Sequence, residues 1–248
     1  MKISIYIFLL LVITSCGISE DCFKGNGNSV TQLFPLEGFT KVKVYDGVGL
    51  VIKEGPNYEV KIVTNDKIID NIDVAMQGDM LVVKDNSTCN IARGYGQTVV
   101  YVTTPNLEEI HSKTEQDIRS DGVLNYPELA VFSTDLSDGA GTGDFYLELD
   151  SNNVYIESNN ISNFYISGRT INLNVFFSWG NGKFKGENFI VTNILNVIHR
   201  GSNDMTIFPI YDLSGAIYAT GNVILKNNPS NSNTLQAFFT GQIINDFN

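Results

Sequence analysis

The chain has 248 residues, 43% of them hydrophobic, so it is too apolar for a disordered protein and long enough for one large domain or two small ones. Its formal net charge of −11 argues against nucleic acid as a partner. We interpret the acidity mainly as a solubility device, with attraction of cations or basic partners as the alternative.

Residues 1–15 have the pattern of a lipoprotein signal peptide. Lys2 supplies a positive start, and the apolar run after it is too short to cross a bilayer as a helix. The run ends in an aliphatic residue, two small residues and Cys16, which is the order of a lipobox. We therefore expect cleavage before Cys16 and a lipid anchor on its thiol, as in an outer membrane lipoprotein. An ordinary leader with an incidental cysteine is the alternative.

Residues 16–33 are rich in glycine, asparagine and serine, and we expect them to be a tether. The tether leads to a single domain at residues 34–248. Ser19-Glu20-Asp21 resembles the acidic export signal of Bacteroidetes surface lipoproteins, although a solvated tether has the same composition. The cell surface and the periplasmic face both stay open as locations.

Two further cysteines, Cys22 and Cys89, form an even pair in an oxidising compartment. We predict a disulfide between them, with two buried free thiols as the alternative. The bond would close a loop of roughly 68 residues and add about 4 kcal/mol of stability on the chain-entropy model.

The segment 34–105 alternates apolar and polar residues as β-strands do. The apolar positions are Val42 and Val44, Val48 to Ile52, Val60 and Ile62, Met80 and Val82, and Val99 to Val102. Gly55-Pro56-Asn57 marks a turn. Helical spacing occurs over Lys67–Asp73, which is about two turns at most.

The second half of the chain contains an internal repeat. Its apolar members are spaced by 19, 20, 21 and 18 residues, at Phe145, Phe164, Phe184, Met205 and Val223. A second apolar column follows each of the first four members, at Val154/Ile156, Leu173/Val175, Leu195/Val197, and Leu213 with Ile217. Ile118 followed by Leu129/Val131 resembles an earlier copy. Each unit is therefore predicted to be two short strands separated by polar turns.

Stacking is the way such units bury their apolar faces, because one unit of about 20 residues cannot do so alone. Nineteen of the 28 asparagines follow residue 150. Turn asparagines tolerate left-handed backbone angles and bond the rung above. We therefore predict an all-β parallel β-helix, with an antiparallel sandwich as the alternative. The tether is expected to cap one end, and Phe238-Phe239 with Ile243-Ile244 the other.

A family resemblance rests on motifs in a fixed order. They are Asp21-Cys22-Phe23-Lys24, Glu54-Gly55 at a strand turn, Cys89–Tyr95 leading into Val99–Leu107, and the Gly-rich repeats Gly139–Asp144 and Ser214–Asn222. Together they make nearly the whole mature chain similar to the head GIN domain family of Bacteroidetes, labelled auto-transporter adhesins. The resemblance implies a right-handed parallel β-helix and supports the Cys22–Cys89 disulfide. The turns depart from the family, since Asn and Lys replace several Gly-Ser-Gly residues.

Catalytic chemistry has few candidates. The two histidines, His111 and His199, are expected at solvent-facing strand or turn positions. No Cys or His cluster has metal-ligand spacing, and a Ser-His-Asp triad would need one of these two imidazoles. Gly139 to Gly143 is interpreted as a turn, because no helix follows it to bind phosphate. We predict no catalytic residue, no metal site and no cofactor.

The densest acidic group comprises Asp135, Asp138, Asp144, Glu148 and Asp150. Asp144, Glu148 and Arg169 are candidates to converge on adjacent rungs, as in β-helix enzymes that cleave polysaccharides. A solvated outer face is the simpler interpretation. Calcium binding by Asp138 and Asp144 is a weaker alternative.

Outward aromatic residues are the ligand-binding candidates. Tyr146, Tyr155 and Tyr165 occupy the outward phase of three predicted strands, so Tyr146 and Tyr165 are expected to stack one rung apart. Trp179 lies in a turn. Such side chains bind sugar rings or proteins, and they also pack across strands without any ligand.

These features predict a non-catalytic cell-envelope lipoprotein with an adhesin-like binding or structural role. Its partners would be the membrane, through the lipid anchor, and a glycan or protein ligand. A carbohydrate-active enzyme on the same scaffold is the alternative, and a structural or envelope-stress component that faces the periplasm is a third. The oligomeric state stays open.

Overall fold

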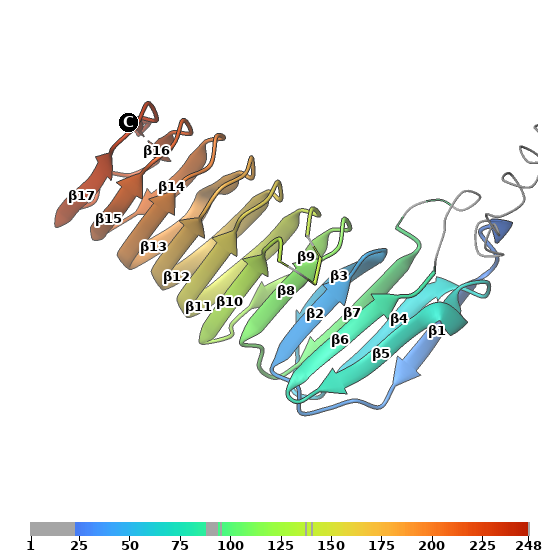
Figure 1. Ribbon diagram of the computed structural model, residues 1–248. Helices are drawn as coiled ribbons and strands as arrows, with labels where there is room; N and C mark the ends of the chain where they lie inside the picture. Colours follow the sequence, from blue (N-terminus) through green and yellow to red (C-terminus); the bar gives the residue numbers. More distant parts are fainter. Residues whose placement is uncertain (1–22, 88–93, 95, 137, 140, 248) are drawn as a thin grey trace, which may run out of the picture.

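The computed structural model describes residues 23–87, 94, 96–136, 138–139 and 141–247. They form an all-β solenoid whose parallel rungs stack along one axis (Figure 1). The parallel β-helix predicted from the repeat is confirmed. The predicted leader and the three cysteines (Cys16, Cys22 and Cys89) lie outside the described residues, so lipidation and the disulfide stay predictions.

The described part of the chain contains eighteen strands. The first nine are β1 Ser29–Phe34, β2 Lys41–Tyr45, β3 Val48–Glu54, β4 Glu59–Asn65, β5 Ile72–Gln77, β6 Met80–Asp85, β7 Thr98–Thr104, β8 Glu109–Lys113 and β9 Ile118–Leu124. The others are β10 Glu128–Ser133, β11 Phe145–Ser158, β12 Phe164–Phe177, β13 Phe184–His199, β14 Met205–Pro209, β15 Asp212–Ile217, β16 Val223–Leu225, β17 Ser232–Ala237 and β18 Ile243–Asn245.

The rungs build two faces around one core. Face I runs β1-β4-β7-β3-β9, then through the first halves of β11, β12 and β13, to β14, β16 and β18. Face II runs β5-β6-β2-β8-β10, then through the second halves of the same three strands, to β15 and β17. The long strands β11 to β13 therefore join the faces, where two separate short strands per unit were predicted.

Stacking order departs from chain order in the first half of the chain. The β2–β3 pair lies between the β6–β7 rung and the β8–β9 rung, because β2 pairs with β6 and β8 while β3 pairs with β7 and β9 (Figure 1). The antiparallel strands β5, β4 and β1 then cover this end of the stack.

The predicted repeat coincides with the register of face I. Phe145, Phe164, Phe184, Met205 and Val223 are in register on successive rungs, and all are fully buried. The rings of Phe145 and Phe164 stack with their centroids 4.6 Å apart. Ile118 is in register with Phe145, so the earlier copy is confirmed as well.

The second column is confirmed except at its last member. Val197 is in register with Gly215, whereas Ile217 lies two residues further on, opposite His199. Gly215 has a φ of +129°, and a Cβ there would lie 1.9 Å from the carbonyl oxygen of Val197. This position therefore requires glycine, and the apolar pattern alone selected the wrong residue.

Asparagines bond between rungs as predicted, but one ladder of them lies within strands β11 to β13 rather than in turns. The Asn172 amide donates to Asn153 Oδ1 at 2.7 Å, and Asn193 donates to Asn172 Oδ1 at 3.0 Å. Among the described residues, every positive φ belongs to a glycine. The expected left-handed asparagines are therefore wrong, and side-chain amide bonds account for the enrichment.

Other predictions of local structure are corrected at the ends of the stack. Strand β1 falls partly within the predicted tether and pairs with β4. The predicted helix shrinks to a 3-10 turn at Ile69–Asn71 before β5. Phe238 and Phe239 are 60% and 63% exposed, so they do not close the far end. Within the described residues, no helix has the length and apolarity needed to cross a membrane.

His199 lies in the core, so its predicted exposure is wrong. Its side chain is fully buried and borders Phe177 edge-on. The Gly201 amide donates to Nδ1 at 3.3 Å, and Nε2 lies 2.9 Å from the Asn203 carbonyl oxygen. An amide only donates and a carbonyl only accepts, so these contacts select the neutral imidazole with its proton on Nε2.

We expect the free energy of unfolding to fall as the pH falls below about 6.5. Burial lowers the pKa of His199 and of His111, so the unfolded chain takes up protons before the folded chain does. Urea unfolding at pH 7.5, 6.5 and 5.5 measures the slope, which is at most about 1.4 kcal/mol per pH unit for each histidine. The double variant His111→Gln/His199→Gln should lose the slope between pH 7.5 and 5.5. An unchanged slope in that variant would contradict the assignment.

Candidate functional site

Two tyrosines stack on the outer surface of face I. Tyr146 of β11 is in register with Tyr165 of β12, and their ring centroids lie 4.8 Å apart with 5° between the planes. Both point outward because Phe145 and Phe164, one residue before each, point into the core. The predicted stacking of this pair is confirmed.

Cations lie on both sides of the tyrosine pair. Arg119 is in register with Tyr146, and its guanidinium carbon lies 4.0 Å from the ring centroid. Asp117 holds this guanidinium through a 2.6 Å contact. Lys185 is in register with Tyr165 on the next rung. A cation over an exposed ring contributes about 0.5 to 1 kcal/mol. The Arg119 contact therefore helps to hold the tyrosine stack in place without a ligand.

The same row of outward side chains continues toward β4. Val51 is in register with Arg119, Tyr101 with Val51, and Lys61 with Tyr101. The Lys61 ammonium lies 4.8 Å from the Tyr101 ring centroid. We call this set the face I row: Lys61, Tyr101, Val51, Arg119, Tyr146, Tyr165 and Lys185. With adjacent strands about 4.8 Å apart, its six steps span about 29 Å.

A shallow groove of about 350 Å³ lies beside the tyrosine pair. Most of its lining side chains carry hydrogen-bonding groups: Ser120, Tyr146, Glu148, Tyr165, Ser167, Lys185, Glu187 and Asn188. Further grooves of about 230 and 420 Å³ lie along the Val51 part of the face I row. The face thus offers an extended polar surface rather than one deep pocket.

Stacking decides which part of each tyrosine meets solvent. One ring face of Tyr146 is covered by Arg119 and the other by Tyr165. Ring edges and hydroxyls are therefore the accessible groups, and the remaining ring face is that of Tyr165 toward Lys185. Desolvation, followed by nearby Asp117 and Asp144, raises the pKa of Tyr146, so its hydroxyl stays protonated and able to donate at neutral pH.

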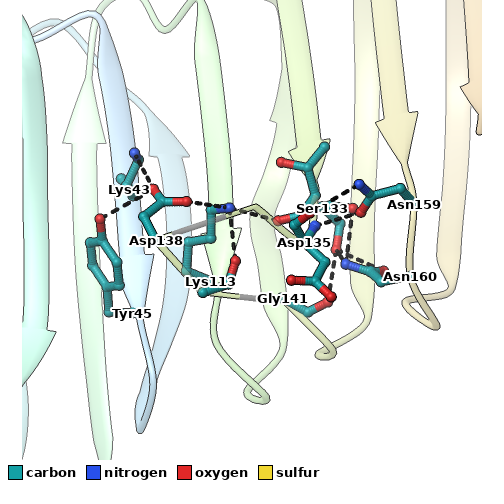
Figure 2. A network of polar contacts seen from close by, with 11 residues as sticks. Lys43, Tyr45, Lys113, Ser133, Asp135, Asp138, Gly141, Asn159 and Asn160 are labelled. Atoms are coloured by element: carbon teal, nitrogen blue, oxygen red, sulfur yellow. Dashed lines mark hydrogen bonds and ion pairs between the residues drawn. The ribbon is translucent and has the colours of Figure 1, made fainter.

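A charged network lies on face II, around the Lys113 side chain and Asp138 (Figure 2). The Lys113 ammonium contacts Asp138 Oδ1 at 2.8 Å and the carbonyl oxygens of Thr134 and Gly139 at 2.6 and 3.0 Å. Lys43 contacts the other oxygen of Asp138 at 3.1 Å. The Lys113 side chain is only 3% exposed.

We call this network the clamp, because Lys113 ties Asp138 and two backbone carbonyl groups to the end of β8. Lys113 has three N–H donors and three acceptors, so its hydrogen-bonding capacity is fully used within the protein. Hydrogen bonds from Lys113, and then from Lys43, outweigh desolvation and lower the pKa of Asp138 to about 2. The sequence pattern did not single out this site, because strand alternation places Lys113 on the same side of β8 as the half-buried Glu109 and His111.

Residues 38–229 match the family described as "Putative auto-transporter adhesin, head GIN domain". The chain belongs to this family. The predicted resemblance is thereby confirmed, and the match covers the stack from before β2 to the turn before β17. No curated protein matches the chain.

Solved structures share the fold of this head GIN domain. A putative adhesin from Bacteroides fragilis superposes with a TM-score of 0.77 at 18% identity, covering 88% of this chain and 97% of its own. A putative lipid binding protein from Parabacteroides distasonis gives 0.63 at 13% identity, with 90% and 98% coverage. A putative adhesin from Parabacteroides merdae gives 0.62 at 14%, also with 90% and 98%. At these identities, the likeness establishes the fold.

The other predicted aromatics of the head GIN domain lie away from the tyrosine pair. Tyr155 is on face II, where its ring centroid is 5.8 Å from that of Phe132 and its hydroxyl donates to Glu157 at 2.8 Å. Burial and Glu157 raise the pKa of Tyr155 to about 12. Trp179 is 60% exposed in the turn between β12 and β13. The four predicted aromatics therefore do not form one site.

His111 of the head GIN domain is a packing residue on face II. Its ring stacks on Phe132 with centroids 4.6 Å apart, and Nε2 lies 2.7 Å from Glu109. The predicted solvent-facing position is therefore only partly correct, because burial is sufficient to lower the pKa of His111. Neither histidine contacts a serine hydroxyl in the described part of the chain.

The predicted acidic cluster is not assembled. Arg169 forms a bidentate pair with Asp150, at 2.7 and 3.0 Å, instead of meeting Asp144 and Glu148. Asp144 accepts from the backbone and side-chain amides of Asn163 on the next rung. Among the described residues, no three His, Cys, Asp or Glu side chains are grouped to hold a metal ion.

Proposed function

We propose that this head GIN domain protein is a non-catalytic, adhesin-like module of the cell envelope that binds a glycan along face I. The observation that carries the proposal is the Arg119–Tyr146–Tyr165 stack beside its polar groove. The family description supports a surface adhesion role. The fold likeness to structures named putative adhesins is consistent with it.

The composition of the groove favours a glycan over other ligands. Its hydroxyl, amide and charged groups match a hydroxyl-rich chain, and the face I row is long enough for several sugar units. A protein ligand would be expected to meet an apolar central anchor, and the stacked tyrosines offer mainly ring edges. The polar lining also does not favour a lipid, the ligand class in the name of the P. distasonis protein.

The proposed location of this protein in the cell envelope is inferred from sequence features. Lipidation of Cys16 would anchor it, and a Cys22–Cys89 disulfide would hold the tether close to the first rungs. A solenoid presents its long faces side-on, so face I would be accessible to an extended polymer close to the membrane.

The double variant Tyr146→Phe/Tyr165→Phe is expected to weaken glycan binding about tenfold, a loss of about 1.4 kcal/mol. The change removes both hydroxyls and leaves the ring stack in place. The measurement is binding of the purified full-length protein to a glycan array, followed by titration of the best glycan.

Tyr155→Phe is the matched control, because it removes a tyrosine hydroxyl from face II and should leave binding unchanged. Unchanged binding by the double variant would place the ligand elsewhere. A wild-type protein that binds no glycan but captures a protein on the same face would replace the glycan with a protein ligand.

A further inference from the structure

The β17–β18 end of the solenoid has unpaired strand edges. Within the described residues, β17 pairs with β15 and β18 pairs with β16, and no strand follows on the outer side of either (Figure 1). The last rung buries little beyond Leu235, which is 6% exposed. Both backbone edges and the end of the core therefore face outward.

The last rung also lacks the usual protection of an edge. Edge strands are normally guarded by lysine, proline or a bulge that prevents pairing with another chain. Residues 227–245 contain no charged side chain, and neither β17 nor β18 contains a proline. Lys226 and Asp246, which border this segment, neutralise each other in an ion pair.

Exposed aromatic groups accompany the open edges. The Tyr218 ring stacks on Phe238 with centroids 5.3 Å apart, and Arg200 lies over the other side of Tyr218 at 5.0 Å. Phe238 is the last ring of this stack and is 60% exposed. Phe239, at 63%, lies next to it. A further rung would cover the free face of Phe238.

We propose that this end is an interface between two copies of the chain, joined β17 to β17 and β18 to β18 in antiparallel pairs. A two-fold contact uses the same surface on both copies and closes on itself. It would satisfy both open edges at once and cover Leu235 and Phe238.

A second copy offers both strand edges at the matching separation, and charge directs its contact to this end. Two molecules of net charge −11 repel each other over most of their surface, and the last rung is a surface where contact brings no like charges together. The opposite end is different, because its edge strands β1 and β5 are antiparallel to the strands they pair with, and β5 carries Asp73 opposite Lys84 of β6. A head-to-tail filament is therefore disfavoured relative to a closed dimer.

Native mass spectrometry of the full-length protein, released from detergent micelles, tests the proposal. We expect the wild type to appear at twice the mass of one chain. Gln236→Lys combined with Ile244→Lys places a guarding charge on each edge and should weaken the dimer at least tenfold. Phe238→Ser, which adds no charge and leaves both strands intact, should weaken it as well.

Gln32→Lys is the matched control, since it makes the same substitution in β1, the edge strand at the opposite end. It should leave the dimer intact, and circular dichroism verifies that each variant is folded. The proposal would be overturned if the wild type were monomeric both at stock concentration and after 100-fold dilution. A dimer that Gln32→Lys dissociates and Gln236→Lys/Ile244→Lys does not would overturn it as well. The interface is several rungs from the tyrosine groove, so this result is independent of the proposed glycan binding.

Discussion

Replacing Phe164 with alanine is expected to lower the free energy of unfolding by about 3 to 5 kcal/mol. Phe164 is fully buried, stacks on Phe145 at 4.6 Å and borders Phe177 at 5.5 Å. It is also in register with Phe184 on the next rung, so its removal opens a cavity between neighbouring units. Each rung depends on its neighbours for burial. The substitution therefore weakens the packing between rungs in the middle of the stack. Urea unfolding followed by circular dichroism measures the loss in free energy of unfolding.

Tyr165→Ala is the control, since it truncates the next residue of the same strand on the outer surface. Its free energy of unfolding should fall by about 1 kcal/mol, which is the contribution of one aromatic contact. Equal losses for the two variants would contradict the inward and outward assignment on which the face I row depends.

Asp138→Asn is expected to lower the free energy of unfolding by about 3 kcal/mol at pH 7. The change leaves the Lys113 ammonium, which is 3% exposed, without its counter-ion. We expect the lower end of the range for a broken buried pair, because the Asp138 side chain is itself 37% exposed. Thermal and urea unfolding of both proteins measure the difference.

The pH dependence gives this prediction a second measurement. Asp138 has a folded-state pKa of about 2 and an ordinary value of 3.8, so its contribution is complete above pH 3.8 and is lost as the pH falls through 2. The difference between wild type and Asp138→Asn should therefore narrow between pH 4 and pH 2.

Asp135→Asn is the matched control for Asp138→Asn. It removes the same charge from the same segment, and the hydrogen bonds between Asp135 and Asn159 use backbone atoms of Asp135. Its effect should stay within about 0.5 kcal/mol. A loss as large as that of Asp138→Asn would show that net charge, rather than the clamp on Lys113, controls stability.

The spacing of apolar residues along the sequence was sufficient to predict the register of the repetitive second half of the molecule. In a stacked solenoid, residues that meet across rungs recur at a nearly constant step, so Phe145, Phe164 and Phe184 could be aligned from their spacing. The Tyr146–Tyr165 stack followed from the same register, because each lies one residue after a core phenylalanine. Gly215 escaped this reasoning, since the close approach of the Val197 carbonyl cannot be seen in an apolar pattern.

The chain by itself therefore determined the fold class, the rung spacing and the outward tyrosine pair, all of which are encoded by neighbours along the sequence. The tertiary structure decided what depends on distant segments: the position of β2–β3 between later strands, the burial of His199, and the clamp that brings Lys43 to Asp138 across 95 positions. It also decided that Arg169 meets Asp150 rather than Asp144, and that the β17–β18 edges stay open. Side-chain periodicity reports which face a residue is on, whereas only packing reports which residues share that face.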